Sequence, residues 1–120
     1  MNYRCLTNNP MIYDEKAVNM EFIEGTPLNL FKTIREQILK GYKLITHPLT
    51  SSLPPNVNPY KTVFLSLQAY KEIDVESFNI IEKSIEYTES LMENRPIPSW
   101  DEKSLKDFQL VDKDLIKHLL

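Results

Sequence analysis

The side chains best suited to chemistry gather in a proline-rich segment, residues 46–61. Thr46 and His47 open this segment, and the hydroxyl groups of Ser51 and Ser52 follow closely. Histidine titrates near neutral pH, so His47 could exchange protons or bind a polar ligand. A serine near a histidine also suggests a nucleophile with its base, but the segment lacks the glycine of a nucleophile elbow and an assigned acid partner. The pattern favours ligand or partner recognition over hydrolysis, and the plainer alternative is hydrogen bonding that holds the loop to the domain.

The second half of this segment adds amides, a phenol and an amine. Asn56 and Asn58 precede Tyr60 and Lys61, where a strand is expected to begin. Lys61 could hold an anion to which the asparagine side chains donate hydrogen bonds. The loop contains no glycine, which excludes a phosphate-cradling P-loop. An ordinary turn with a solvated lysine is the alternative interpretation.

Two amides near the start of the chain, those of Asn8 and Asn9, could meet this loop. They follow a β-prone stretch and precede Pro10, so they either form a turn or present their side chains at the end of a strand. The two histidines lie far apart in the sequence and the carboxylates are scattered over expected helices. We therefore predict no metal site, and no cofactor is indicated.

Helices are expected where hydrophobic residues recur at helical spacing. Thr26 and Pro27 form a start signal for a helix over residues 27–40. Asp74 has the character of a second N-cap, and the periodic pattern after it predicts a helix that ends near residue 95.

The C-terminal segment, residues 96–120, begins with a rigid proline-rich linker. Ser99 and Glu102 have the spacing of a capping box, and an apolar stripe predicts an amphipathic helix that could be broken near Asp112. The apolar face of this helix must cover the sheet or meet another chain, so packing within the domain and self-association are both open.

Strands are expected from β-prone composition or from alternation of polar and apolar residues. They cover residues 3–7, 18–23, 42–46 and 60–67. The order of these elements predicts a single α/β domain over residues 1–120, built on a mostly parallel four-stranded sheet with helices packed on it. Residues 1–95 are expected to form the core, and the C-terminal helical segment is expected to be linked to it through the prolines.

Length and charge set further limits. The chain has 120 residues, one cysteine and a formal net charge of −3, which suits one small domain and excludes a disulfide framework within the chain. Basic residues prevail over 26–61 and acidic residues over 71–95, but no basic run has the footprint of nucleic-acid binding. No apolar run reaches the ~20 residues of a membrane span, and the N-terminus lacks the features of a secretion signal. We therefore expect a cytoplasmic protein without nucleic-acid or membrane partners.

Three blocks of the sequence, together with Glu24-Gly25 before the helix expected at 27–40, resemble the GrdX family. The blocks are Thr7-Asn8-Asn9-Pro10, Lys40-Gly41-Tyr42-Lys43-Leu44-Ile45-Thr46-His47-Pro48-Leu49 and Asn58-Pro59-Tyr60-Lys61-Thr62-Val63. Members of the family are small proteins associated with the glycine, sarcosine and betaine reductase genes of amino-acid-fermenting anaerobes. The resemblance covers about residues 5–90 and implies a cytoplasmic accessory of that reductase system. It implies no catalytic residues, because none is established for the family.

The function is left between two hypotheses. In the first, the chain is a noncatalytic binding protein whose partner is a reductase component or a small polar metabolite. In the second, it is a small enzyme that acts on an anionic amino-acid derivative, with His47 as acid or base and Lys61 as anion anchor. Both require the proline-rich loop to fold back onto the amino-terminal bend. The predicted binding surface comprises Asn8, Asn9, Thr46, His47, Ser51, Ser52, Asn56, Asn58, Tyr60 and Lys61.

Overall fold

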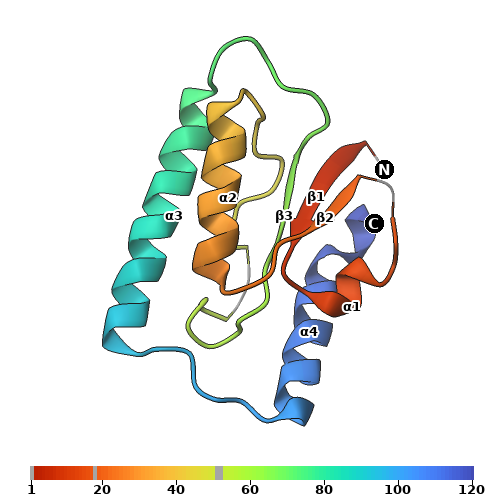
Figure 1. Ribbon diagram of the computed structural model, residues 1–120, viewed down its shortest axis with the longest axis vertical. Helices are drawn as coiled ribbons and strands as arrows, with labels where there is room; N and C mark the ends of the chain where they lie inside the picture. The colour runs from red at the N-terminus through yellow and green to blue at the C-terminus, as the bar shows by residue number, and fades with distance from the viewer. Residues whose placement is uncertain (1, 18, 51–52) are drawn as a thin grey trace.

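A small sheet in the middle of the molecule separates two layers of helices. The computed structural model describes residues 2–17, 19–50 and 53–120. Its elements in chain order are β1 (Tyr3–Thr7), α1 (Pro10–Tyr13), β2 (Met20–Phe22), α2 (Pro27–Leu39), β3 (Thr62–Ser66), α3 (Val75–Asn94), α4 (Glu102–Ile116) and a 3₁₀ turn, η1 (Lys117–Leu119). Helices α2 and α3 cover one face of the sheet, whereas α1 and α4 cover the other (Figure 1).

The sheet is mixed rather than mostly parallel. Among the described residues its strand order is β2-β1-β3, with β1 in the centre. β1 pairs in parallel with β2, where Cys5 lies opposite Met20, and antiparallel with β3, where Cys5 lies opposite Phe64. The prediction of an α/β fold is confirmed, but the prediction of a four-stranded, mostly parallel sheet was wrong.

The strand expected at residues 42–46 runs antiparallel beside β3 without becoming a regular strand. It forms an isolated bridge to β3 at Leu44. The Leu44 N–H donates to Ser77 Oγ on α3 (3.0 Å), and the Phe64 N–H donates to Thr46 Oγ1 (3.0 Å). Backbone bonds flank the bridge, from the Ile45 N–H to the Phe64 carbonyl and from the Ser66 N–H to the Lys43 carbonyl (both 2.9 Å). Side-chain hydroxyls take the next partners on either side, so the ladder does not extend along the segment.

A short helix replaces the turn that was expected after β1. Asn9 caps α1, since its Oδ1 accepts from the Met11 N–H (3.0 Å), and Pro10 takes the first helical position. The second strand occupies Met20–Phe22, inside the expected 18–23; Val18 lies outside the described residues.

The two long helices begin where their capping residues predicted. Thr26 caps α2, which runs to Leu39, and forms a reciprocal capping box with Asn29. At the start of α3, Asp74 Oδ2 accepts from the Ser77 N–H (3.1 Å). Local side-chain chemistry therefore sets these boundaries.

Helix α4 begins later than expected and continues through the expected break. Its cap is Asp101, whose Oδ1 accepts from the Ser104 N–H (2.8 Å), so the capping box predicted at Ser99 was wrong. Asp112 lies within the helix and does not start a new turn. Its side chain is buried against the rest of the molecule.

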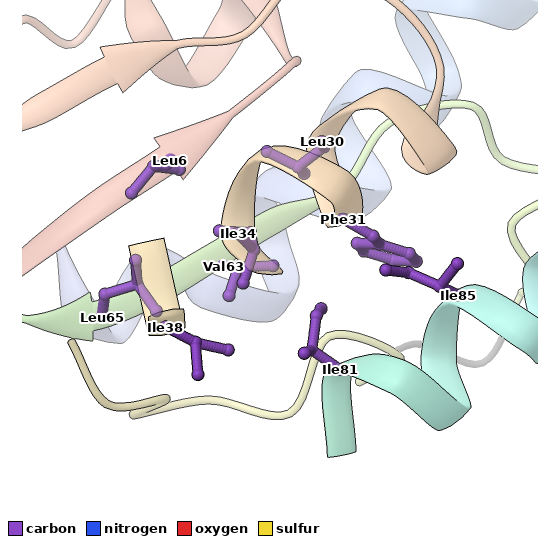
Figure 2. Packing of buried hydrophobic residues seen from close by; sticks show 9 residues of the cluster. All are labelled: Leu6, Leu30, Phe31, Ile34, Ile38, Val63, Leu65, Ile81 and Ile85. Carbon is purple, nitrogen blue, oxygen red and sulfur yellow. The ribbon is translucent and has the colours of Figure 1, made fainter. Parts of the chain in front are cut away.

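Hydrophobic side chains fill both sides of the sheet because successive residues of a strand point to opposite faces. Leu6 of β1 faces α2 and α3, while Cys5 packs with Phe64, with Ile12 of α1 and with Ile116 of α4. Burial and the negative charge of Asp112 raise the pKa of the Cys5 thiol to about 12, so it stays protonated. Figure 2 shows the larger cluster, formed by Leu6, Leu30, Phe31, Ile34, Ile38, Val63, Leu65, Ile81 and Ile85.

Candidate functional site

The loop at residues 53–61 folds back onto the end of β1 and onto α4, where polar side chains become buried together. The side chains of this set are no more than 7% exposed. We call the set the buried polar cluster; it consists of Thr7, Asn8, Asn9, Asn58, Lys61, Thr62 and Asp112.

Asn8 joins segments that are far apart in the sequence. Its Nδ2 donates to the Pro59 carbonyl (2.8 Å) and to the Gly25 carbonyl just before α2 (3.0 Å). Its Oδ1 accepts from the Lys61 N–H (2.8 Å) at the start of β3. One amide therefore ties together the end of β1, the turn before α2 and the proline-rich loop.

Two other asparagines hold helix α4. Asn9 Nδ2 donates to the carbonyl of Gln109 (2.9 Å), and Asn58 Nδ2 donates to that of Phe108 (3.2 Å). The Asn58 Oδ1 also accepts from the Tyr60 N–H (2.9 Å) and so shapes its own loop. These amides act as clamps between the loop, the amino-terminal bend and the helix.

The remaining polar residues of the loop also contact the C-terminal segment. The Tyr60 hydroxyl accepts from Gln109 Nε2 (3.0 Å), and Asn56 Nδ2 donates to the Arg95 carbonyl (3.1 Å). Trp100 Nε1 donates to the Val57 carbonyl (2.9 Å). The loop and the C-terminal segment are thus held together by polar contacts along their length.

Sequence reasoning missed three members of the cluster, Thr7, Thr62 and Asp112, and of these Asp112 is the ionisable one. Its Oδ2 accepts from Thr62 Oγ1 (2.8 Å) and from Asn9 Nδ2 (3.0 Å). Burial raises the pKa of this carboxyl group above its usual value, and those two hydrogen bonds and the charge of Lys61 offset only part of the rise. The sequence held a signal, because Asp112 lies four residues after Phe108 and four before Ile116, on the apolar stripe.

Lys61 is buried rather than solvated, with 2% of its surface exposed. Its Nζ donates to the Leu53 carbonyl (3.1 Å). Burial lowers the pKa of the ammonium group to about 8, and the charge of Asp112 works against this shift. The alternative of a solvated lysine at this turn was therefore wrong.

The start of the loop lies apart from these contacts. His47 is exposed, and its Nδ1 accepts from the Leu49 N–H (3.1 Å), so a neutral ring carries its proton on Nε2. The hydroxyl of Thr46 is bound to β3, as described above. Ser51 and Ser52 lie outside the described residues. The structure thus brings together the amino-terminal amides and the 56–61 half of the predicted surface, while His47 bonds within its own turn.

Stability should depend on pH through Lys61. Between pH 8 and 10.5 the unfolded lysine holds more protons than the buried one, so the free energy of unfolding should rise with pH in this window. The rise attributable to Lys61 should reach up to about 3 kcal/mol. Lys61→Met should remove it, as measured by denaturant unfolding of both proteins at several pH values.

The buried Cys5 thiol lowers the free energy of unfolding as the pH rises through an overlapping range, so it opposes the effect of Lys61. The difference between the wild-type and Lys61→Met pH profiles isolates the contribution of Lys61. The matched control is Lys103→Met, because Lys103 is on the surface of α4 with 87% of its side chain exposed. Its stability should follow the wild-type pH profile. A Lys61→Met profile parallel to that of the wild type would contradict the prediction.

The fold and the site define a small α/β protein whose loop residues clamp a C-terminal helix. A family model described as GrdX-like protein matches residues 4–120, and the chain belongs to this family, as the resemblance indicated. The search of curated proteins and the search of solved structures both gave no match.

Searches of the described part of the chain for a metal site and for a membrane helix were negative. No group of His, Cys, Asp and Glu side chains there is arranged to hold a metal ion. Within the same residues, no helix has the length and apolar character needed to cross a bilayer.

Proposed function

We propose that this protein is a noncatalytic, cytoplasmic accessory of the glycine, sarcosine and betaine reductase system of anaerobes, and that it acts by binding a protein component of that system. Membership of the GrdX-like family supports the association. The observation that carries the binding role is an exposed apolar surface at one end of the molecule.

This surface, which we call the apolar end, lies where α2 ends and α3 begins, at the top of Figure 1. Three large hydrophobic side chains that line a groove there, Leu39, Ile73 and Val75, are each at least 46% exposed. Ile45, Leu67 and Tyr70 are also exposed and line a second hollow beside Tyr3 and Ser66. The loop that carries the buried polar cluster lies toward the opposite end. Exposed apolar surface gathered in a groove marks interaction sites.

The shape and charge of the apolar end fit a protein partner. A groove of about 160 Å³ lies between Leu39, Ile73, Val75 and Phe78. Charges of both signs surround the apolar side chains; Lys43 Nζ, for example, lies 4.3 Å from the centre of the Tyr70 ring. An apolar centre with a polar rim is the usual anatomy of a protein–protein interface.

The polar residues of the family blocks support a noncatalytic role. The side-chain amides of Asn8, Asn9 and Asn58 bind backbone groups of this chain. A side chain engaged in this way positions structure and is not free to act on a substrate.

Binding should depend on the apolar end and can be measured with purified glycine reductase components by isothermal titration calorimetry. Ile73→Asp/Val75→Asp should weaken binding at least about tenfold, which corresponds to 1.4 kcal/mol, because it places charge in the apolar centre. Val75 opens α3, where an aspartate suits the helix dipole, so the fold should be retained.

The matched control is Leu110→Asp, since Leu110 is 50% exposed on the distant helix α4. It should bind as the wild type does. Absence of binding to every reductase component, or equal binding by Ile73→Asp/Val75→Asp, would contradict the proposal. Thermal unfolding of each variant shows whether a loss of binding reflects a loss of fold.

Binding of a small polar metabolite is the alternative, with or without turnover. Two observations favour it: His47 is exposed with Nε2 free of the bond that holds Nδ1, and Asn56 Oδ1 is buried without a hydrogen-bond partner in the described residues. A turnover found in a metabolite screen, and abolished by His47→Ala with the melting temperature unchanged, would favour an enzyme.

A further inference from the structure

A carboxylate is enclosed where α4 crosses the end of the sheet. Asp112 is 5% exposed, and its Oδ2 receives hydrogen bonds from Asn9 on the amino-terminal bend and from Thr62 on β3. The positive charge of Lys61 acts on the same carboxyl group. The donors and the cation come from the amino-terminal bend and from the start of β3, whereas the carboxylate comes from the C-terminal helix.

The hydroxyl groups around this carboxylate are oriented to donate toward it. A hydroxyl carries one proton, and Thr62 uses its proton on Asp112. In its contact with Thr7 (2.8 Å), Thr62 therefore accepts, and Thr7 shares its proton with a longer contact to the Lys61 carbonyl (3.3 Å). Thr7 Oγ1 in turn accepts from the Asn9 N–H (3.0 Å). This chain of bonds presents a preformed donor to an anion.

We propose that Asn9 and Thr62 form a binding site for a small carboxylate, with Lys61 contributing positive charge at longer range, and that Asp112 occupies this site as an internal ligand that a free carboxylate can replace. Hydrogen bonds from an amide and a hydroxyl to a charged group, in the field of an ammonium group, suit such a ligand. The proposal does not rest on the reductase association, and its tests use no reductase component.

Replacement is feasible because of how α4 is attached. The Phe108 and Gln109 carbonyls that Asn58 and Asn9 grip lie inside a helix, so releasing the clamps leaves their helical partners in place. The helix is joined to α3 through the proline-rich linker at 96–98. A free carboxylate must compete with this tethered group and with the packing of Ile116 beside Cys5 and Phe64, so displacement needs a carboxylate concentration above about millimolar.

Asp112→Ala tests the site directly, because it removes the internal carboxylate and leaves a space of formate size. Its melting temperature should fall by about 5 °C or more, since buried donors lose their acceptor. Sodium formate should restore at least half of this loss with saturation, while sodium chloride and phosphate at the same ionic strength should not.

Matched variants separate binding from general salt effects. Asp114→Ala removes an exposed carboxylate from the same helix and should show no response to formate beyond that to chloride. Asp112→Asn fills the site with a neutral amide and should respond no more than the wild type. Asp112→Ala/Lys61→Met lacks the cation and should lose the rescue.

Equal formate responses in Asp112→Ala and Asp114→Ala would overturn the proposal. If Asp112→Ala does not fold in buffer, its helical circular dichroism signal should return in formate but not in chloride. A helical signal that stays absent in formate would overturn the proposed carboxylate site. A rescue by phosphate as strong as that by formate would overturn the choice of a carboxylate.

Displacement is tested in the wild type by amide hydrogen exchange. Formate in excess should speed exchange at residues 102–116 at least about tenfold relative to chloride, because a 15-residue helix that has lost its packing is only marginally stable in water. This rate ratio corresponds to 1.4 kcal/mol of opening. Exchange in β1 and β3 should not change. Unchanged protection of α4 would show that Asp112 is not replaceable and would overturn that half of the proposal.

Discussion

Gly41→Ala is expected to lower the free energy of unfolding by about 4 kcal/mol, through backbone strain and steric overlap. Gly41 has φ +107°, a conformation that residues with a Cβ rarely adopt. An added Cβ would also overlap the backbone oxygen of Tyr70, and Gly41 O accepts from the Tyr70 N–H (2.9 Å). In this variant the turn after α2 must move away from the loop between β3 and α3. Urea unfolding measures the resulting loss of unfolding free energy.

Gly25→Ala is the matched control for this effect. Gly25 also has a positive φ (+118°), but a Cβ there would meet the side chain of Asn29, which can move at the expense of its capping bonds to Thr26. The loss should be about 1–2 kcal/mol, from the backbone conformation and the weakened cap. Equal losses in the two variants would mean that the overlap with Tyr70 adds nothing. Because Gly41 borders the apolar end, Gly41→Ala should also weaken partner binding.

Asn8→Ala is expected to cost about 3 kcal/mol, because it leaves the buried Lys61 N–H without an acceptor and removes the donor to two carbonyl groups. No other single side chain in the described structure is seen to join β1, the turn before α2 and the 53–61 loop. Denaturant unfolding should show a lower midpoint, and exchange of the Lys61 amide should become faster.

Two further substitutions serve as comparisons for Asn8→Ala. Asn79→Ala alters an exposed asparagine on α3 and should change stability by no more than about 0.5 kcal/mol. Asn8→Asp keeps an acceptor for the Lys61 N–H but loses both N–H donors, so it should also be destabilising. A loss below about 1 kcal/mol in Asn8→Ala would contradict a structural role for this amide.

The family blocks have a common structural meaning in this chain. The first and third supply Asn8, Asn9, Asn58, Lys61 and Thr62 to the buried polar cluster. The second spans the end of α2, the Gly41 turn and the segment beside β3. Residues that were predicted as a binding surface thus also form the site where α4 packs against the rest of the molecule. Their contact with an external ligand remains a prediction.

Predictions succeeded where the signal and the structure lie within a few residues. Thr26 and Asp74 marked the starts of α2 and α3, and the β-prone stretches marked β1 and β3. The same local approach failed at residues 42–46, whose β-prone composition was correct but whose pairing with β3 is cut short by the hydroxyl groups of Ser66 and Thr46. It also placed the α4 cap at Ser99 instead of Asp101, since both positions offer a suitable side-chain oxygen.

By itself, the sequence determined the family, the α/β class and the helices with strong caps, because capping and hydrophobic periodicity act within a turn or two of the chain. Only the tertiary structure decided the strand order and the composition of the buried polar cluster. Asp112 meets Asn9 across 103 positions of sequence and Thr62 across 50. Such contacts depend on how whole segments pack, since a carboxylate is stable inside a protein only where packing brings donors and a cation to it.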